Sequence, residues 1–249
     1  MMTLSRNIRG ADYAAIYVVG DLHGCYRLLM QELEKIRFNF EQDLLICTGD
    51  LVDRGSENLE CISLLDQPWF LSVRGNHEEM CIKGRDDVWI QDMHARNGGE
   101  WFYLLSTEKQ DELSEIFSQL PLVIEIQLED KKIGILHADE DKKIGILHAD
   151  EDKKIGILHA DIDIHDWNQF KTNIAKGERK IPGLTSAYTN ALWGRGRIRH
   201  HSKRYGTVKN IDEVYLGHTI VKRHTQIDNC HYIDVGSSYT QQLCIVKIK

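Results

Sequence analysis

The sequence lacks the features that would assign it to several specialised classes of protein. Its six cysteines include no CxxC pair, which excludes a zinc knuckle and a thioredoxin-type redox motif. No apolar run is long enough to span a bilayer, and no apolar segment follows Arg6 and Arg9 as it would in a signal peptide. The net charge of -7 argues against a general nucleic-acid-binding protein. We therefore expect no nucleic-acid or membrane partner and a location in the reducing cytoplasm.

What the sequence does contain is the composition of an ordinary globular protein. Hydrophobic residues make up 42% of its 249 residues, which is ample material for a buried core. Three apolar segments, 16–19, 43–47 and 69–73, are each followed by a polar turn and then by a pattern typical of a helix. This alternation predicts parallel strands joined by right-handed helical crossovers, with all three turns at one edge of a sheet. We expect a single α/β domain over residues 1–249.

The three turns carry carboxylate, amide and imidazole groups suited to binding metal ions. The first turn contains Asp21 and His23, the second contains Asp50, and the third contains Asn76. A histidine from a later repeat and His218, at the end of another apolar segment, complete the set. Because it contains no thiolate, this set suits Mn²⁺, Fe or Zn²⁺. It suffices for two ions if Asp50 bridges them, and two ions about 3.5–4 Å apart can hold a shared hydroxide for attack on a phosphate ester.

Further residues near these turns could complete the chemistry of phosphate-ester hydrolysis. Three arginines could bind phosphate through planar, paired donors: Arg54, Arg74 and Arg195. His77, in the third turn, could donate a proton to the leaving group, while Asp53 could orient it and raise its pKa. Each residue alone has a plain structural explanation, but their joint occurrence at successive strand ends does not. Other histidines lie outside these turns, and we interpret them as structural or surface residues: His94, His165, His224 and His231.

An 11-residue segment, EDKKIGILHAD, occurs three times in succession over residues 129–161. The period is too short and the copies too alike for a solenoid, so we interpret the repeat as a recent duplication or an artefact of sequence assembly. One copy is typical of a turn, a strand and a histidine at the strand's end. His137, His148 and His159 are the alternatives for the ligand. Using His159 would place the surplus residues in a hairpin turn, where a long insertion costs little entropy, so we favour it, followed by His137.

The last third of the chain favours β-structure again. Residues 163–209 are polar and include a basic stretch from Arg195 to His201. Segments 213–219, 231–236 and 242–248 are then typical of strands. We expect them to be antiparallel strands that complete a second sheet.

Three segments taken together resemble a known family. Gly20–Gly24, Gly49–Gly55 and Gly75–Glu78 resemble the signature motifs of the phosphoprotein phosphatases within the calcineurin-like metallophosphoesterases. The resemblance covers essentially the whole chain and is strongest to the small bacterial and bacteriophage-type serine/threonine protein phosphatases. It implies an α/β (α+β) fold in which two mixed sheets form a β-sandwich flanked by helices. It also implies a metal-dependent phosphatase that acts on phosphorylated proteins, with Mn²⁺ as the usual metal and Fe, Zn or Ni as alternatives.

The resemblance implies a role for each group already named. One metal ion would be held by Asp21, His23 and Asp50. The second would be held by Asp50, Asn76, the repeat histidine and His218. His77 would be the general acid, paired with Asp53, and phosphate would be bound by Arg54, Arg74 and Arg195.

Two other functions remain open from the sequence. Related enzymes with the same metal motifs hydrolyse dinucleoside polyphosphates such as diadenosine tetraphosphate, although the Asp53-Arg54 pair favours phosphomonoesters. A catalytically silent phosphoprotein-binding module is the other alternative, with the triplicated segment as the cause of the lost activity.

Overall fold

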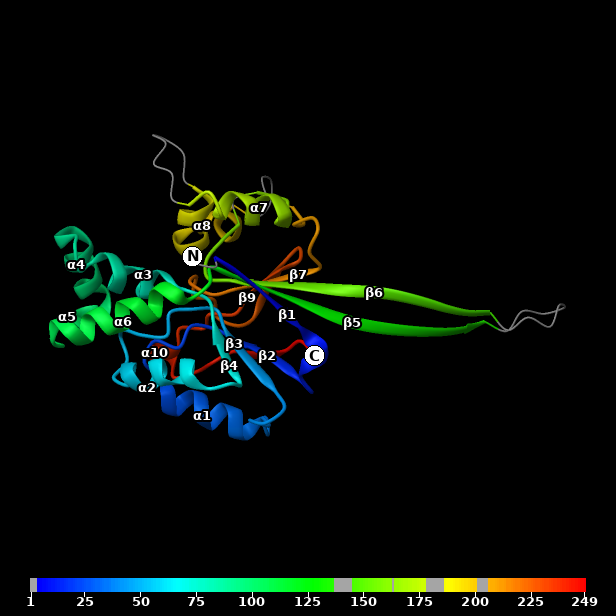
Figure 1. Ribbon diagram of the computed structural model, residues 1–249, viewed down its shortest axis with the longest axis horizontal. Helices are drawn as coiled ribbons and strands as arrows, with labels where there is room; N and C mark the ends of the chain where they lie inside the picture. The colour runs from blue at the N-terminus through cyan, green and yellow to red at the C-terminus, as the bar shows by residue number, and fades with distance from the viewer. Residues whose placement is uncertain (1–3, 137–144, 163, 178–185, 201–205) are drawn as a thin grey trace.

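Two β-sheets pack face to face and carry helices on their outer faces (Figure 1). This computed structural model describes residues 4–136, 145–162, 164–177, 186–200 and 206–249. Within these residues, no helix combines the length and the apolar character that crossing a bilayer requires. The architecture is the expected mixed α/β sandwich of two mixed sheets flanked by helices.

The four-stranded sheet holds the three strand-turn-helix units. Its strand order is β10-β2-β3-β4. The bounds of these strands are Ile245–Lys247 (β10), Ile16–Val19 (β2), Leu44–Cys47 (β3) and Phe70–Ser72 (β4). β2, β3 and β4 run parallel, as the alternation of strands and helices predicted. The turns after these strands therefore emerge at the same edge of the sheet.

The six-stranded sheet has the order β1-β5-β6-β7-β9-β8. Its first three strands are Ser5–Arg9 (β1), Val123–Leu136 (β5) and Gly145–Leu158 (β6). The other three are Glu213–Leu216 (β7), Thr225–Ile227 (β8) and Cys230–Tyr232 (β9). β6 and β7 are parallel, so they too end at a shared edge.

The arrangement of the C-terminal strands differs from the expectation. β7 and β9 are parallel to each other, and the antiparallel neighbour of β9 is β8, which the sequence pattern did not separate. β10 pairs antiparallel with β2 in the other sheet, so the prediction that all these segments complete the second sheet was wrong. The physical reason is that β2 would otherwise be an unpaired edge strand, and the apolar pattern of β10 does not specify which edge it joins.

The core is built from strands that face both ways. In β3, Leu44 and Ile46 point between the sheets, where they pack with residues such as Ile157 of β6. The alternate residues Leu45 and Cys47 point to the opposite face. Because successive side chains of a strand point to opposite faces, a strand buried on both faces reads as a continuous apolar run.

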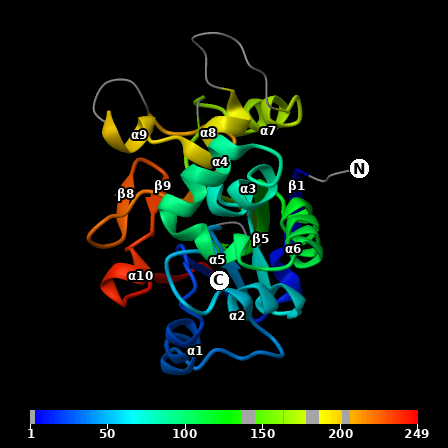
Figure 2. The ribbon, with the colours of Figure 1, turned by 90° about the vertical axis from the view of Figure 1, so that its left-hand side faces the viewer.

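Helices cover the outer faces and one end of the sandwich. The four-stranded sheet is covered by α1 and α2, whose bounds are Tyr26–Lys35 and Asn58–Ser63. The six-stranded sheet is covered by α7 and α8, whose bounds are Trp167–Ile174 and Ala187–Trp193. At one end of the sandwich lie Asn76–Lys83 (α3), Val88–His94 (α4), Glu100–Tyr103 (α5) and Thr107–Gln119 (α6), as Figures 1 and 2 show. Two short helices, Gly196–Arg199 (α9) and Ser237–Thr240 (α10), complete the set.

The β5-β6 hairpin extends away from the body at the end opposite α3–α6 (Figure 1). Only residues 123–127 of β5 pair with β1, and only residues 155–158 of β6 pair with β7. The described parts of the first two repeat copies lie in the two-stranded part of the hairpin, where His148 pairs through its backbone with Ile133. The third copy enters the sheet as the end of β6 and places His159 directly after that strand, while His137 lies outside the described residues.

Candidate metal centre

Five strand ends converge on one buried cluster of side chains. Asp21 follows β2, Asp50 follows β3 and Asn76 follows β4 in the four-stranded sheet, while His159 and His218 follow β6 and β7 in the other sheet. All five side chains are buried or nearly so. Both sheets of the sandwich therefore contribute groups to one site at their carboxyl ends, where open α/β sheets place ligands.

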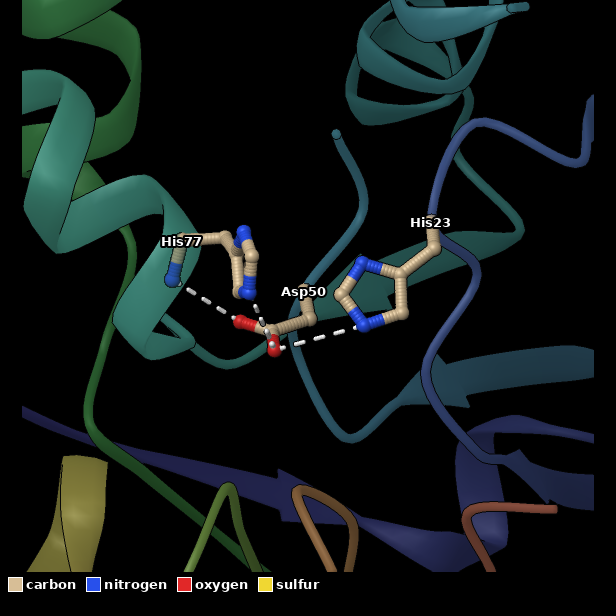
Figure 3. Close-up of side chains that lie close together, drawn as sticks. All are labelled: His23, Asp50 and His77. Atoms are coloured by element: carbon tan, nitrogen blue, oxygen red, sulfur yellow. Dashed lines mark hydrogen bonds and ion pairs between the residues drawn. The ribbon is translucent and has the colours of Figure 1, made fainter. Parts of the chain in front are cut away.

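Asp50 lies at the centre of this cluster. Its Oδ2 atom is 3.6 Å from His23 Nε2, 3.8 Å from His77 Nε2 and 3.4 Å from His159 Nε2. Figure 3 shows the carboxylate between His23 and His77, with the backbone N–H of His77 donating to Oδ1 at 3.0 Å. Burial raises the pKa of Asp50, but the surrounding imidazoles, His159 foremost, outweigh burial and lower it. The carboxylate is therefore anionic and central, as a bridging ligand must be.

Three of the imidazoles, those of His23, His159 and His218, are held in the neutral form that binds metal. His23 Nδ1 donates to the Val52 carbonyl at 2.9 Å, and His159 Nδ1 donates to the Thr48 carbonyl at 2.9 Å. Such a hydrogen bond fixes the tautomer and directs the Nε2 lone pair into the cluster. Burial lowers the pKa of His23 to about 3 and the pKa of His218 to about 2. No proton therefore competes for these lone pairs near neutral pH.

The unbalanced electrostatics of the cluster fit a cation. His159 Nε2 lies 2.9 Å from Asn76 Oδ1, although both atoms are acceptors in this tautomer and amide orientation. Burial and the nearby carboxylates of Asp234 and Asp50 raise the pKa of Asp21 well above its usual value. A divalent ion would satisfy both the paired acceptors and the crowded carboxylates. Two groups could each hold an ion and share Asp50: His23, Asp50 and His77 form one, and Asp50, His159 and His218 form the other.

The backbone at the cluster adopts positive φ angles, which residues other than glycine rarely adopt. Nine non-glycine residues in the described chain have positive φ, and five of them belong to the site: His23 (43°), Asp50 (50°), Asp53 (75°), Arg54 (67°) and His218 (62°). Such residues cost about 1–3 kcal/mol each and persist only where surrounding structure enforces them. Five strained residues at one site indicate that the direction of their side chains matters more for the protein than the conformational free energy of the backbone.

Glu78 and two glycines support the ligand carboxylates. The buried Glu78 carboxylate accepts from the backbone N–H groups of Asp50 (3.0 Å), Leu51 (2.8 Å) and Gly75 (2.8 Å), which ties the second turn to the start of α3. A Cβ atom on Gly75 would lie 2.1 Å from Asp50 Oδ1, and one on Gly217 would lie 2.0 Å from an oxygen of Asp21. The site therefore needs glycine at both positions so that the carboxylates can approach the backbone.

Beside the cluster lie the predicted proton donor and its partner. His77 Nδ1 donates to Asp53 Oδ2 at 2.5 Å, so its Nε2 atom faces Asp50. Burial lowers the pKa of His77, but the charges of Asp50 and Asp53 outweigh burial and raise it. The exposed Arg54 lies over both imidazoles: its Nη1 is 2.5 Å from His23 Nε2 and its Nη2 is 3.1 Å from His77 Nε2. The positively charged guanidinium of Arg54 therefore lies on the solvent side of the buried carboxylate cluster.

The other two arginines of the predicted set have different surroundings. Arg195 is partly exposed and donates to His218 through Nε at 3.1 Å and through Nη2 to its carbonyl at 3.3 Å, which places it at the cluster. Arg74 is buried, and its guanidinium donates to Glu79 at 3.0 Å and to the carbonyls of Ser118 (2.6 Å) and Leu120 (3.2 Å). These contacts place Arg74 between α3 and α6, and its binding of phosphate stays a prediction.

Two residues that contact Asp53 of the proton-donor pair were not among the predicted site residues. His94 was interpreted as structural or surface, but it is fully buried and its Nε2 lies 2.7 Å from Asp53 Oδ2. Trp101 Nε1 donates to the other Asp53 oxygen at 2.7 Å. Neither residue follows a strand, so the strand-end pattern could not find them. The adjacent glycines Gly98 and Gly99 were the available signal, because such a pair marks a close approach of backbone to another group.

Comparison with known proteins agrees with this geometry. A family model described as calcineurin-like phosphoesterase matches residues 14–222. Serine/threonine-protein phosphatase 2 of Salmonella typhimurium is 35% identical over 253 residues, which cover 97% of this chain and 99% of that protein. A symmetrical bis(5'-nucleosyl)-tetraphosphatase of Mannheimia succiniciproducens is 50% identical over 66 residues, which cover 26% of this chain and 24% of that protein.

The fold agrees with solved structures as well. A protein serine/threonine phosphatase from Saccharomyces cerevisiae superposes with a TM-score of 0.58 at 17% identity, covering 94% of this chain and 71% of that chain, which supports the fold alone. The family model and the full-length relative together show that the chain belongs to the calcineurin-like phosphoesterases, hydrolases that use divalent metal ions. The protein is a metallophosphoesterase.

Proposed function

We propose that this protein is a metal-dependent protein serine/threonine phosphatase. The observation that carries the proposal is the arrangement around Asp50, which lies within 4 Å of three imidazoles beneath an exposed arginine. We propose that the metal ligands are Asp21, His23, Asp50, Asn76, His159 and His218. The similarity to a bacterial protein phosphatase along nearly the full length of both chains supports phosphoproteins as the substrate class.

In this proposal the residues around the cluster divide the work of phosphomonoester hydrolysis. Two divalent ions, most simply Mn²⁺, would activate a water molecule and withdraw charge from the phosphate oxygens. Arg54 and Arg195 donate paired hydrogen bonds to the remaining phosphate oxygens, exchanging their present imidazole partners for stronger anionic acceptors. His77 gives the proton on Nε2 to the departing serine or threonine oxygen, while Asp53 keeps hold of Nδ1.

Hydrolysis of dinucleoside polyphosphates is the second candidate. The match to a symmetrical bis(5'-nucleosyl)-tetraphosphatase favours it, but that match covers 26% of this chain, whereas the protein phosphatase match covers 97%. The third candidate, a catalytically silent binding module, assumed that the triplicated segment disrupts the site. The position of His159 beside Asp50 argues against that assumption. All six cysteines are free thiols, which fits the proposed location in the reducing cytoplasm.

The test is a side-by-side rate comparison. With added Mn²⁺, the protein should hydrolyse a phosphoserine peptide with kcat/KM at least about 10-fold above that for diadenosine tetraphosphate, and Asp50→Asn should abolish both activities. Faster hydrolysis of the dinucleotide would establish the second candidate instead. Turnover that survives Asp50→Asn would refute the site itself.

A further inference from the structure

Asp53 joins two histidines, and the proposed mechanism uses only one of them. Its Oδ2 atom lies 2.5 Å from His77 Nδ1 and 2.7 Å from His94 Nε2, and its Oδ1 atom accepts from Trp101 Nε1 at 2.7 Å. Asp53 and His94 have no exposed surface. Three donors therefore converge on one buried carboxylate, and hydrogen bonds to a charged acceptor are about twice as strong as neutral ones.

The hydrogen-bond partners fix the tautomer of His94. The Asp53 carboxylate accepts only, so His94 Nε2 must carry the proton that lies between them. In the neutral ring Nδ1 is then the acceptor, so the Tyr103 hydroxyl, 2.9 Å away, donates to it. The chain Tyr103-His94-Asp53-His77 thus has one consistent direction of donation toward Asp53 from both sides. Burial raises the pKa of Asp53, yet the hydrogen bonds from His77 and His94 outweigh it and lower the pKa to about 2.

The segment that follows His94 packs against the site. Residues Ala95–Gly99 form a π-type turn between α4 and α5, and the Gly98 carbonyl accepts from the Arg54 backbone N–H at 3.3 Å. A Cβ atom on Gly99 would lie 2.1 Å from the His94 ring. The ring is therefore packed between the Gly99 backbone and Asp53 and has no room to rotate away.

A metal ion held by this group is the competing explanation. Asp53, Cys81 and His94 offer ligand atoms within 4.8 Å of one another. However, burial raises the pKa of the Cys81 thiol well above its usual value, so its sulfur stays protonated and is a poor ligand. The Nε2 atom of His94 already carries a proton toward Asp53. The contacts suit a hydrogen-bond chain better than a third metal site.

We propose that His94 is a positioning residue for proton donation by His77. His94 and Trp101 hold the Asp53 carboxylate in one orientation, and Asp53 in turn holds the His77 ring with Nε2 facing the leaving group. This role rests on the proposed phosphomonoesterase function. Without the His94 donor, the carboxylate loses one of its fixed contacts and the His77 ring loses its fixed direction, so the loss appears only where the leaving group needs a proton.

The experiment compares two esters that differ in that need. The serine oxygen of a phosphoserine peptide leaves as a strongly basic alkoxide and needs a proton, whereas 2,4-dinitrophenolate leaves without one. His94→Leu should lower kcat for a phosphoserine peptide by about 30-fold and for 2,4-dinitrophenyl phosphate by less than about 3-fold. His94→Gln, which keeps an N–H donor directed at Asp53, should recover most of the loss. In a His77→Asn background, His94→Leu should have no further effect, because the two residues act as one unit.

Two further variants separate positioning from packing. Gly99→Ala retains the His94 donor but displaces its ring, so it should reproduce the leaving-group dependence of His94→Leu. His231→Leu is the matched control: His231 is also buried and stacks on Tyr215, yet it lies on β9 away from Asp53. It should lower the melting temperature without any leaving-group dependence.

Each outcome decides between the roles. Equal losses on both esters in His94→Leu, or no loss on either, would show that His94 only packs and would overturn the proposal. Wild-type protein that hydrolyses neither ester would overturn the proposed function, and the role of His94 would fall with it. A further loss on the phosphoserine peptide when His94→Leu is added to the His77→Asn background would show that His94 does not act through His77 and would overturn the proposal.

Discussion

His159 and Asn76 are 83 residues apart in the chain, yet His159 Nε2 lies 2.9 Å from Asn76 Oδ1. The contact joins the ends of β6 and β4, which belong to different sheets. It shows that the site depends on the packing of the sandwich, because neither sheet alone brings the two acceptors together. It supports the proposal that His159 is the ligand among the three repeat histidines, since within the described residues the third repeat copy is the one that runs into the sheet beside β7.

Substitution of the repeat histidines should therefore have unequal effects. His159→Ala should weaken Mn²⁺ binding by at least about 10-fold, since it removes a ligand that lies 3.4 Å from Asp50. His148→Ala should leave binding and activity unchanged, because its backbone pairs with Ile133 in the projecting hairpin. Isothermal titration of both variants with Mn²⁺ checks this. A loss in His148→Ala with none in His159→Ala would mean that another copy occupies the sheet.

Removal of the surplus repeats should preserve the enzyme. Deleting residues 129–150 joins Leu128 to Glu151 and keeps the strand that pairs with β7. Loop-closure entropy changes by only about 0.6 kcal/mol for each doubling of loop length, so the shorter hairpin should cost little. We expect kcat/KM within about 3-fold of the intact chain, measured on a phosphoserine peptide. Inactivity of a folded, shortened protein would assign the hairpin a role in the reaction.

Substitutions of Arg54 and Arg74 should affect different properties, substrate binding for Arg54 and stability for Arg74. Arg54→Ala should raise KM for a phosphopeptide by about 10-fold and leave the melting temperature nearly unchanged, because Arg54 is exposed over the imidazoles. Arg74→Met should reduce the free energy of unfolding by about 1.5–3 kcal/mol, since it removes the buried guanidinium from Glu79, which retains Lys83 as an ion-pair partner. Denaturant unfolding and steady-state kinetics on both variants check the contrast. A KM effect in folded Arg74→Met without lost stability would show instead that Arg74 binds phosphate, as the sequence predicts.

The sequence was most informative where polar, metal-binding residues directly follow a strand. The turns after β2, β3 and β4 could be read because an apolar run, a glycine and a polar ligand follow one another within a few residues. The partner of β10 could not be read, since a short apolar strand does not specify which sheet it joins. The direction of Arg74 was equally hidden, because side-chain direction depends on Glu79 and α6. His94 lacked any strand-end signal, and its role depends on the fold around Asp53.

The most direct test of the central claim is the number of Mn²⁺ ions bound per chain, measured by elemental analysis after equilibrium dialysis. If the strand-end cluster is a two-metal centre bridged by Asp50, the wild-type protein should bind about two ions and Asp50→Asn should bind markedly fewer. The His231→Leu control should retain both. A wild-type protein that binds no metal, or an Asp50→Asn protein that binds two ions as tightly as wild type, would contradict the account.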